Sequence, residues 1–388
     1  MRQTFLPYCK PVLTDDEIGA VAQSLRNSWL TTGPVVRELE TAFAERTGVK
    51  HAIALSSCTA ALHVALHAMG VGPGDEVVMP SLTFVAGAQC TMELGAKPVF
   101  ADIDPGSLSL TVASIDAVVT ERTKVIMPMP YGGRPLDIAA IVEYARPRGI
   151  RVLEDAAHAA GMFDRGEWAG TRSDAAAYSF YATKNLTSAE GGILLTNDDA
   201  LAERARVVGL HGMDKDAWKR YTATGSWRYD VREPGFKYNL PDPLAALALA
   251  QLGRLNAMQD RRDEIAARYD EALSQLPGVR LQTPPANPGD RHSWCMYVMM
   301  IDERRAGISR DAMIDALRAE NIGTSVHYIP THLFSGYRSL GRFHLPATEH
   351  TWEQLISLPL YPAMTDADVD DVIGAIQAIL SPRSYAIA

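Results

Sequence analysis

The sequence predicts an α/β fold in which a largely parallel β-sheet is covered by helices on both faces. Between residues 57 and 196, short apolar runs alternate with segments of helical periodicity, and such alternation indicates crossover connections between parallel strands. The chain has 388 residues, of which 47% are hydrophobic, enough for a large core and two or three globular units. We therefore expect a large α/β domain with a smaller unit beside it.

The expected elements follow one another along this region. A helix over residues 60–69 ends at Gly70, and a second helix ends near Gly149. Strand-like apolar runs are predicted at residues 76–79, 98–102, 124–129, 151–155, 175–180 and 193–196. Sheets of this kind hold ligands at the carboxyl ends of their strands. Residues that directly follow these runs are therefore the first candidates for a functional site.

Residues 211–238 interrupt the alternation. They contain six aromatic side chains in 28 positions, against 7% in the whole chain, and a structureless segment of that length in a compact domain is usually functional. We expect a binding loop or a subunit contact. The alternative is a loop that only packs a dimer.

A long amphipathic helix follows, with Pro241 and Pro243 as start signals and apolar residues at helical spacing as far as Leu273. A helix of this length suits a link between a large and a small domain. A strand at residues 295–301 and a helix at 310–320 indicate a smaller α+β unit. We expect an N-terminal arm and large domain over residues 1–255, and a small C-terminal domain over residues 256–388.

Composition and charge exclude several classes of function. With 37 Lys+Arg and 46 Asp+Glu, the formal net charge is −9, whereas proteins that bind nucleic acids usually carry a basic face. No run approaches the ~18 apolar residues of a membrane span, and no leader-like apolar core is present. We expect a cytosolic protein with no nucleic-acid or membrane partner. Four scattered cysteines without a CxxC pair predict neither a disulfide framework nor a metal site.

Lys184 is the leading candidate for a catalytic residue. It stands in the segment SFYATKNLTSAEGG (179–192), just past an apolar strand, in a turn of small residues. Burial at such a position lowers the pKa of a lysine, and the neutral amine can then form a Schiff base. Taken alone, a lysine here is more often an ordinary surface residue.

Asp155 ends another apolar strand, in the segment VLEDAAH (152–158). An ionised carboxylate there suits the protonated ring nitrogen of a pyridine-type cofactor that acts as an electron sink. The plain alternative is a helix N-cap. His158 lies three residues further on, where it holds Asp155, borders the ring, or is simply a hydrogen-bonded core histidine.

Two further segments complete the candidate site. Ser57, Cys58 and Thr59 open a helix, and the free amide groups and dipole of such a terminus suit a phosphate, which Ser179 is also placed to contact. Phe84 follows a strand and is suited to stack on a planar ring. A simple helix cap and core packing are the alternatives. Together these residues supply what pyridoxal 5'-phosphate (PLP) chemistry requires.

Several stretches of the chain together match the pattern of one known family. They are SWLTTGP (28–34), SSCTAALHVAL (56–66), GDEVVMPSLTFVA (74–86), VLEDAAHAAG (152–161), SFYATKNLTSAEGG (179–192), PGFKYNLPDPLAALALAQL (234–252), IGTSVHYIPTH (322–332) and SLPLYP (357–362). Through them the chain resembles, across nearly all of its length, the DegT/DnrJ/EryC1/StrS family of sugar aminotransferases. The resemblance implies an aspartate-aminotransferase-like large domain with a mainly parallel seven-stranded sheet, a small C-terminal α+β domain, and PLP as the cofactor.

The resemblance also implies where each candidate residue lies. The residues expected around the cofactor are Lys184 as the internal aldimine and proton carrier, Asp155 at the pyridine nitrogen, His158 beside the ring, Phe84 stacked on it, and Thr59 and Ser179 on the phosphate, beside Ser57 and Cys58. Asn239 matches an asparagine that reaches the phosphate from the neighbouring subunit, which implies a homodimer with shared active sites. The residues expected on the substrate side are Tyr181, Arg228, Arg232, His327 and His332.

By the same likeness, the amino donor is L-glutamate. The branch that the chain most resembles aminates the keto carbon of nucleotide-linked 4-keto sugars and includes enzymes that make UDP-4-amino-4-deoxyarabinose. A 3-keto sugar or a keto-cyclitol is the alternative acceptor. Two departures bear on this choice: Cys58 stands where the family more often has Gly, Ala or another small residue, and Pro130 stands where it often has a histidine.

Three other functions are alternatives. PLP-dependent sugar dehydratases that resemble this family replace the lysine, whereas Lys184 is present. A nicotinamide-dependent dehydrogenase needs GxGxxG directly after a strand, but the cluster of Gly70, Gly72 and Gly74 precedes one. A non-catalytic regulatory protein on the same fold is disfavoured, because the lysine and the aspartate are both retained. The sequence therefore favours ping-pong transamination.

Overall fold

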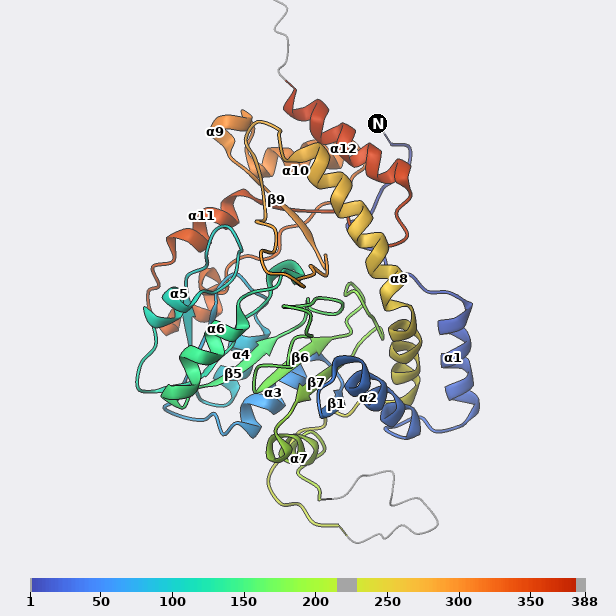
Figure 1. Cartoon of the computed structure of the whole chain (residues 1–388), viewed down its shortest axis with the longest axis vertical. Coiled ribbons are helices and arrows are strands. Elements are labelled where there is room, and N and C mark those ends of the chain that lie inside the picture. The colour runs from blue at the N-terminus through green and yellow to red at the C-terminus, as the bar shows by residue number, and fades with distance from the viewer. Residues whose placement is uncertain (1, 215–228, 382–388) are drawn as a thin grey trace, which may run out of the picture.

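The structure is a computed structural model and describes residues 2–214 and 229–381. Its centre is a seven-stranded sheet with the strand order β1-β7-β6-β5-β4-β2-β3 (Figure 1). The strands are β1 (His51–Leu55), β2 (Glu76–Pro80), β3 (Lys97–Ala101), β4 (Thr123–Ile126), β5 (Arg151–Asp155), β6 (Ala175–Ser179) and β7 (Gly192–Thr196). All neighbours from β6 to β3 are parallel, and β7 is antiparallel to both β6 and β1. The predicted, mainly parallel sheet is confirmed, with β1 as a strand that the sequence pattern did not indicate.

Helices cover both faces of the sheet, because its strands place alternate residues on opposite sides. In β5, Leu153 packs with the residues of one face and Val152 with those of the other. The first face is covered by α3 (Cys58–Ala68), α4 (Ala86–Glu93) and α7 (Asp199–Val208). The second face is covered by α2 (Pro34–Thr47), α5 (Val112–Asp116), α6 (Ile138–Ala145) and the first half of α8 (Asp242–Leu273). Short 3₁₀ turns lie at Tyr131–Gly133 and Arg146–Arg148.

The long helix α8 joins two units of the molecule (Figure 1). Its N-terminal half packs on the sheet through residues such as Leu252 and Leu255, and α1 (Asp15–Arg26) lies along it, where Arg254 pairs with Glu17. Its C-terminal half, from Ile265 onward, belongs to the core of the smaller unit. The expected division of the chain at residues 255 and 256 therefore falls within this helix, and it stays a prediction.

The smaller unit is built around a three-stranded antiparallel sheet with the order β10-β9-β8. Its strands are β8 (Val279–Leu281), β9 (Tyr297–Ile301) and β10 (Leu355–Leu358). Apolar residues of this sheet pack against α8, α10 and α12. The helices of this part are α9 (Glu303–Ala306), α10 (Arg310–Ala319), α11 (Pro346–Gln354) and α12 (Asp366–Leu380), with 3₁₀ turns at Thr331–Leu333 and Ser335–Leu340. The expected α+β character of this unit is confirmed.

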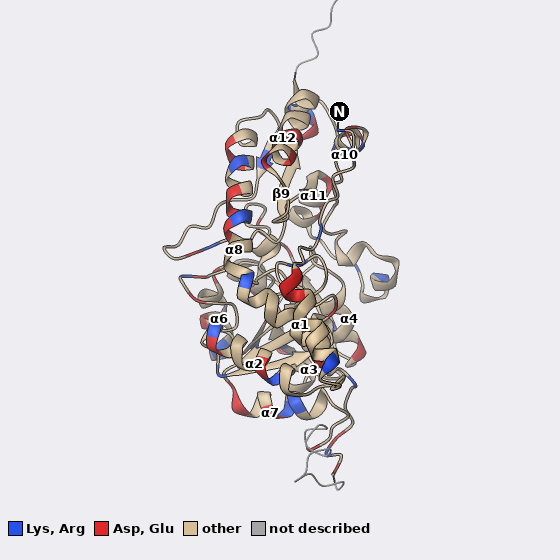
Figure 2. Cartoon of the chain, turned by 90° about the vertical axis from the view of Figure 1, so that its right-hand side faces the viewer, with Lys and Arg blue, Asp and Glu red and all other residues tan. Residues whose placement is uncertain are grey.

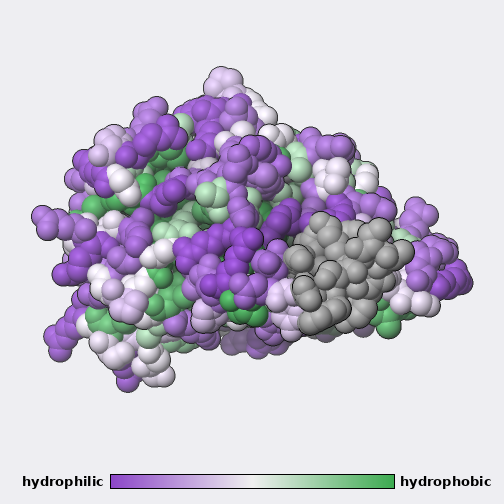
Figure 3. Space-filling view, turned by 90° about the horizontal axis from the view of Figure 1, so that it is seen from below, coloured by the Kyte–Doolittle hydropathy of each residue, from purple (hydrophilic) through white to green (hydrophobic). Residues whose placement is uncertain are grey.

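Charged residues of both signs are interspersed along the ribbon in Figure 2, and both signs occur along the part of α8 in the smaller unit. The face seen from below carries mostly hydrophilic side chains with separate hydrophobic patches (Figure 3). Within the described ranges, no helix is both long and apolar enough to cross a membrane.

Candidate active site

A cavity of about 560 Å³ lies at the carboxyl edge of the large sheet. The residues that follow β1, β2, β5 and β6 reach it because these strands run in the same direction and end at the same edge. The smaller unit adds His327 and Tyr328, and the N-terminal segment adds Tyr8. The predicted residues on its wall are Ser57, Cys58, Thr59, Phe84, Asp155, His158, Ser179, Tyr181, Lys184 and His327.

The loop that carries Lys184 is held by hydrogen bonds on both sides of the lysine. The amide N–H of Lys184 donates to the carbonyl oxygen of Tyr181 at 2.9 Å, which closes a tight turn after β6. The buried side-chain amide of Asn185 donates to the carbonyl oxygens of Ala160 at 3.2 Å and Ser293 at 2.5 Å. These contacts fix the direction in which Lys184 leaves the backbone. The side chain therefore enters the cavity rather than the solvent.

The electrostatic setting of Lys184 differs from the sequence expectation. Burial by itself lowers the pKa of Lys184, but the nearby Tyr328, Cys295 and Asp155 outweigh it, and the pKa is raised. The sequence predicted a neutral amine at Lys184, but the residues of this chain by themselves favour its protonated form. A cationic cofactor ring next to Asp155 would cancel the charge of that carboxylate, and the pKa of the lysine would then fall.

Asp155 ends β5 and is buried, with 6% of its surface exposed. Its Oδ1 accepts a hydrogen bond from the amide N–H of Ala157 at 3.2 Å, and the thiol of Cys58 lies 3.9 Å away. Burial raises the pKa of Asp155, while the Ala157 amide and the Lys184 ammonium oppose that rise. A further N–H donor in the cavity would stabilise the ionised carboxylate of Asp155 as the Ala157 amide does, by donating a hydrogen bond to it.

His158 is a buried histidine that lines the cavity. Its Nε2 and the hydroxyl of Tyr328 are 3.0 Å apart, and the two rings are nearly parallel at 6.2 Å between centroids. Burial, together with Lys184 and the neighbouring His327 and His292, holds its pKa well below the usual value. Its Nδ1 is buried and has no hydrogen-bond partner among the described residues. Of the roles considered for His158, holding Asp155 is not supported, because its hydrogen bond goes to Tyr328.

The segment from Ser57 to Thr59 forms the N-terminus of α3. Ser57 caps this helix, because its Oγ accepts the amide N–H of Ala60 at 3.0 Å. The cap leaves earlier amide groups of the first turn directed at the cavity edge, where the helix dipole favours an anion. Strand β7 starts close by: a Cβ on Gly192 would lie 2.5 Å from the amide nitrogen of Cys58. The bare backbone of Gly192 is therefore what allows the strand and the helix terminus to meet.

The remaining predicted residues on the cavity wall differ in exposure. Phe84 and Tyr181 are exposed, at 54% and 47%, so their rings are free to contact a bound molecule. His327 is held by a hydrogen bond between its Nδ1 and the hydroxyl of Ser357 at 2.9 Å. Pro130, the departure from the family pattern, is buried beside Met129, and it is Met129 that lines the cavity.

Three predicted site residues that the structure describes do not line this cavity. Asn239 donates from Nδ2 to Thr32 Oγ1 at 2.7 Å, and Arg232 forms an exposed ion pair with Glu203 at 3.0 Å. His332 is buried, with Ser81 Oγ 2.7 Å and Glu349 Oε1 3.3 Å from its two ring nitrogens, and its contact with substrate stays a prediction. Arg228 lies outside the described residues.

Three ionisable residues that line the cavity were not singled out from the sequence, namely Tyr8, Tyr328 and Glu190. Tyr328 directly follows the predicted residue His327 in the stretch HYIPTH, so the position of His327 could have pointed to Tyr328 as a site residue. Glu190 lies in the lysine segment itself. No local pattern marks Tyr8, because it reaches the cavity only through long-range contacts of the N-terminal segment.

These residues fit PLP. A lysine amine, a buried carboxylate and a helix N-terminus with free amide groups converge on one cavity, and the unpartnered Nδ1 of His158 is a buried polar atom that a bound ring system could satisfy. The cavity also exceeds the minimum size of small-molecule sites. Fold and site together define a PLP-dependent aminotransferase.

The chain belongs to the DegT/DnrJ/EryC1/StrS aminotransferase family, which matches residues 11–377. It is 48% identical over 383 residues to the spore coat polysaccharide biosynthesis protein SpsC of Bacillus subtilis, with 98% of each chain covered. The fold is similar to that of the aminotransferase TlmJ from Streptoalloteichus hindustanus, with 37% identity, a TM-score of 0.89 and coverage of 97% and 98%.

A second solved structure is the putative sugar aminotransferase Spr1654 from Streptococcus pneumoniae in its PMP form, with 30% identity, a TM-score of 0.89 and coverage of 97% of this chain and 99% of that chain. The same protein is known in a PLP form. The predicted family, fold and cofactor are thereby confirmed. The protein is a PLP-dependent sugar aminotransferase.

Proposed function

We propose that this aminotransferase moves an amino group from L-glutamate to the keto carbon of a nucleotide-linked 4-keto sugar. The observation that carries the chemistry is the convergence of Lys184, Asp155 and His158 on one cavity of about 560 Å³. The acceptor class rests on the resemblance to enzymes that aminate such sugars and on the relation to sugar aminotransferases. The relative SpsC is named as a polysaccharide biosynthesis protein. This agrees with a nucleotide-linked acceptor, because a nucleotide activates a sugar for transfer to a polysaccharide.

Bound PLP supplies an electron sink that stabilises negative charge on the carbon next to the reacting nitrogen. Asp155 would accept a hydrogen bond from the protonated ring nitrogen, and the first turn of α3 with Ser179 would hold the phosphate. Phe84 would contact the ring face. Asp155 and Ser179 end strands, the first turn of α3 starts a helix, and Phe84 lies in the short connection between β2 and α4, so rigid elements set or closely flank these positions.

Lys184 is the residue that moves protons. Its Nζ would remove a proton from the α-carbon of glutamate in the first half reaction and deliver one to the former keto carbon of the sugar in the second. Tyr328 is close enough to Lys184 to raise its pKa, and its hydroxyl lies 3.0 Å from His158 Nε2. The hydrogen bond between His158 and Tyr328 therefore keeps the Tyr328 hydroxyl close to the amine of Lys184. Retention of Lys184 separates this proposal from a sugar dehydratase.

The charges on the cavity support a second part of the proposal, a homodimer with shared active sites. Among the described residues that line it, Lys184 is the one cation, whereas Asp155 and Glu190 are acidic. Burial holds the pKa of His327 at about 4, so this ring is neutral too. The phosphate of the cofactor, the carboxylates of glutamate and a nucleotide diphosphate all need cationic or amide partners. We infer that a second subunit supplies them.

The placement of Asn239 agrees with this inference. Its segment follows the strand end next to Ser56, whose amide N–H donates to the Tyr238 carbonyl at 2.7 Å, yet Asn239 does not line its own chain's cavity. Exposed apolar side chains are available for a subunit contact: Ile18 and Leu25 lie on α1, and Val231 lies within residues 211–238, at 59%, 52% and 51% exposed. The cytosolic location expected from the sequence likewise stays a prediction.

The acceptor is tested by separating the two half reactions. The enzyme loaded with PLP is mixed with L-glutamate, and conversion is followed by the visible spectrum. The aminated enzyme is then offered UDP-linked 4-keto sugars, UDP-linked 3-keto sugars and free keto-cyclitols in single turnovers. We expect amination of a UDP-linked 4-keto sugar. Reaction with a 3-keto sugar or a free cyclitol alone would contradict the acceptor, and lack of conversion by glutamate would contradict the donor.

Shared sites are tested with hybrids of two inactive variants. A Lys184→Ala subunit is mixed with an Asn239→Ala subunit under conditions of proven exchange. If Asn239 acts in the partner's site, one site of each hybrid contains both residues, so part of the activity should return. No recovery would place Asn239 in its own subunit's site or outside the chemistry. A mixture of each variant with itself is the matched control.

A further inference from the structure

The N-terminal segment, residues 2–9, runs as a strap along the smaller unit. The amide N–H of Leu6 donates to the Asn321 carbonyl and the amide N–H of Gly323 donates to the Leu6 carbonyl, both at 2.8 Å. Leu6 and Ile322 thereby form a parallel bridge. The strap is thus paired with a backbone segment that lies more than 300 residues later in the chain.

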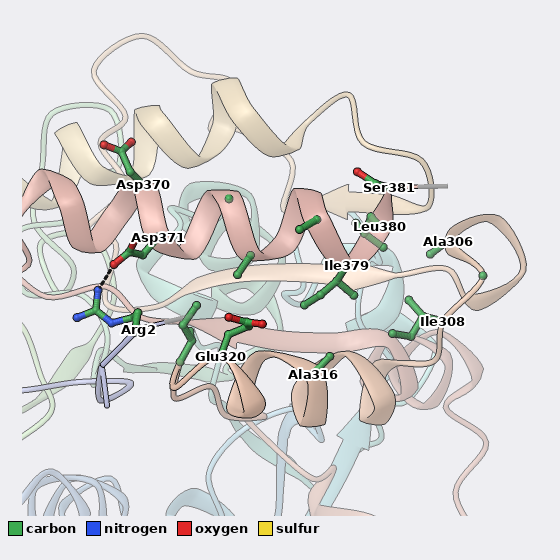
Figure 4. Close-up of a pocket in the computed structure, with 15 residues that line it drawn as sticks. Arg2, Ala306, Ile308, Ala316, Glu320, Asp370, Asp371, Ile379, Leu380 and Ser381 are labelled. Carbon is green, nitrogen blue, oxygen red and sulfur yellow. Dashed lines mark hydrogen bonds and ion pairs between the residues drawn. The ribbon is translucent and has the colours of Figure 1, made fainter. Parts of the chain in front are cut away.

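The first residues of the strap are anchored to α12. The guanidinium of Arg2 pairs with Asp368 at 2.7 Å and with Asp371 at 2.5 Å. Figure 4 shows Arg2 reaching Asp371 at the edge of the hollow between α10 and α12. The Arg2 side chain is largely buried, at 14% exposed, and one of its partners is only 19% exposed, so this contact is sheltered from solvent screening.

The last residues of the strap reach the active site. The thiol of Cys9 donates to the carbonyl oxygen of Thr183 at 3.6 Å, next to Lys184. The ring of Tyr8 packs on that of His327, with 4.9 Å between centroids, and both line the cavity. The strap therefore connects α12 with the lysine loop and makes Tyr8 part of the cavity wall.

Gly323 is the position that allows the strap to lie so close. A Cβ there would be 2.8 Å from Phe5 Cζ, 2.9 Å from the Leu6 carbonyl oxygen and 3.0 Å from the Tyr8 amide nitrogen. Two of these atoms are backbone and cannot rotate away. Any side chain at Gly323 should therefore displace the strap, and Tyr8 with it.

We propose that the strap is a structural wall of the substrate site and that Tyr8 contacts the keto-sugar substrate. A phenol offers a ring for the C–H face of a sugar and a hydroxyl for one of its hydroxyl groups. Burial, with Cys295 and Cys9 nearby, keeps the pKa of Tyr8 well above its usual value, so the hydroxyl is neutral. Glutamate, with two carboxylates, needs cations instead. This assignment rests on the proposed function, because it names a residue that would contact the proposed keto-sugar acceptor.

The test compares Tyr8→Phe, Tyr8→Ala and Gly323→Ala with the control Gly336→Ala, a glycine of the smaller unit with no heavy atom within 4 Å of its added Cβ. The two half reactions are measured separately, with L-glutamate and then with a UDP-linked 4-keto sugar. We expect Tyr8→Phe to weaken use of the sugar about 2- to 12-fold, the range for one neutral hydrogen bond. Tyr8→Ala should weaken it further, and the glutamate half reaction should change less than twofold.

Gly323→Ala should reproduce the effect of Tyr8→Ala without touching the tyrosine. Hydrogen exchange of the peptide that covers residues 2–9 gives a second readout, and its protection should fall in Gly323→Ala but not in Gly336→Ala. Unchanged protection would refute the strap. Equal losses in both half reactions, or none in either, would refute the role of Tyr8.

Failure of the proposed acceptor gives a different result. If the wild-type enzyme aminates only a free keto-cyclitol, the nucleotide part of the proposed function is wrong. The same four variants are then compared on that keto-cyclitol, and a selective loss in the second half reaction would still support Tyr8. Hydrogen exchange needs no substrate, so it tests whether residues 2–9 are held against the smaller unit, whichever acceptor the enzyme uses.

Discussion

Replacing Asp155 with asparagine should separate the chemistry of the site from its packing. Asp155 is buried, and its Oδ1 accepts the Ala157 amide N–H at 3.2 Å. The amide oxygen of an asparagine has the same shape and can accept the same bond. What Asp155→Asn removes is the negative charge that would face the protonated ring nitrogen of bound PLP.

The size of the effect follows from the contact that is lost. A hydrogen bond to a charged group contributes about 1.5–3 kcal/mol, which corresponds to a fall in kcat of about 10- to 150-fold. The electron sink depends on the protonated ring, so the loss in the transition state should reach at least the upper part of this range. Burial raises the pKa of Asp155, so its ionised form is costly to bury. Unloaded Asp155→Asn should therefore be at least as stable as the wild type at pH 8.

The assay measures kcat for the glutamate half reaction, the visible spectrum and the thermal midpoint of the unloaded protein. Glu154→Gln is a matched control, because Glu154 is the adjacent buried carboxylate on the opposite face of β5, where it accepts from Ser173 at 2.6 Å and Gly170 at 2.8 Å. It should keep kcat within about twofold. A kcat for Asp155→Asn within about threefold of the wild type, with PLP bound, would refute the role of Asp155.

Three other predictions follow from the site. Lys184→Ala should abolish turnover and leave a folded protein that still binds PLP noncovalently, as shown by the spectrum after gel filtration; multiple turnover without an added amine would contradict the assignment. Burial raises the pKa of Glu154 from 4.5 to about 7, so the folded state holds this proton more tightly than the unfolded state. The resulting stabilisation is complete below about pH 4.5 and is lost as the pH rises through about 7, with an upper limit of about 3 kcal/mol. The thermal midpoint of Glu154→Gln relative to the wild type should thus increase from pH 5 to pH 8, and a constant difference would contradict this. Arg232→Ala and Arg228→Ala should raise KM for a UDP-linked sugar far more than KM for glutamate, and equal increases would exclude a nucleotide contact by these arginines.

Local sequence determined most of the large domain and the chemical identity of its site. Alternating apolar runs and helical segments predicted the sheet, and parallel strands necessarily bring their carboxyl ends to one edge. For that reason Lys184, Asp155 and Ser57 could be placed together from their positions after strands, before any contact between them was known. Strand β1 was missed, because its run HAIAL is too short to be distinguished from a core helix segment by periodicity.

The tertiary structure alone decided which distant residues complete the cavity and how the lysine is charged. Tyr8 and Tyr328 lie far from Lys184 in sequence, and they reach it through long-range backbone pairing and packing between the two units. The pKa of Lys184 depends on the balance between burial and the surrounding Tyr328, Cys295 and Asp155. His332 had the same local context as His327, yet it is held by hydrogen bonds to Ser81 and Glu349 and does not line the cavity. Charge balance and side-chain direction depend on neighbours that no local pattern encodes, because they are set by the three-dimensional fold.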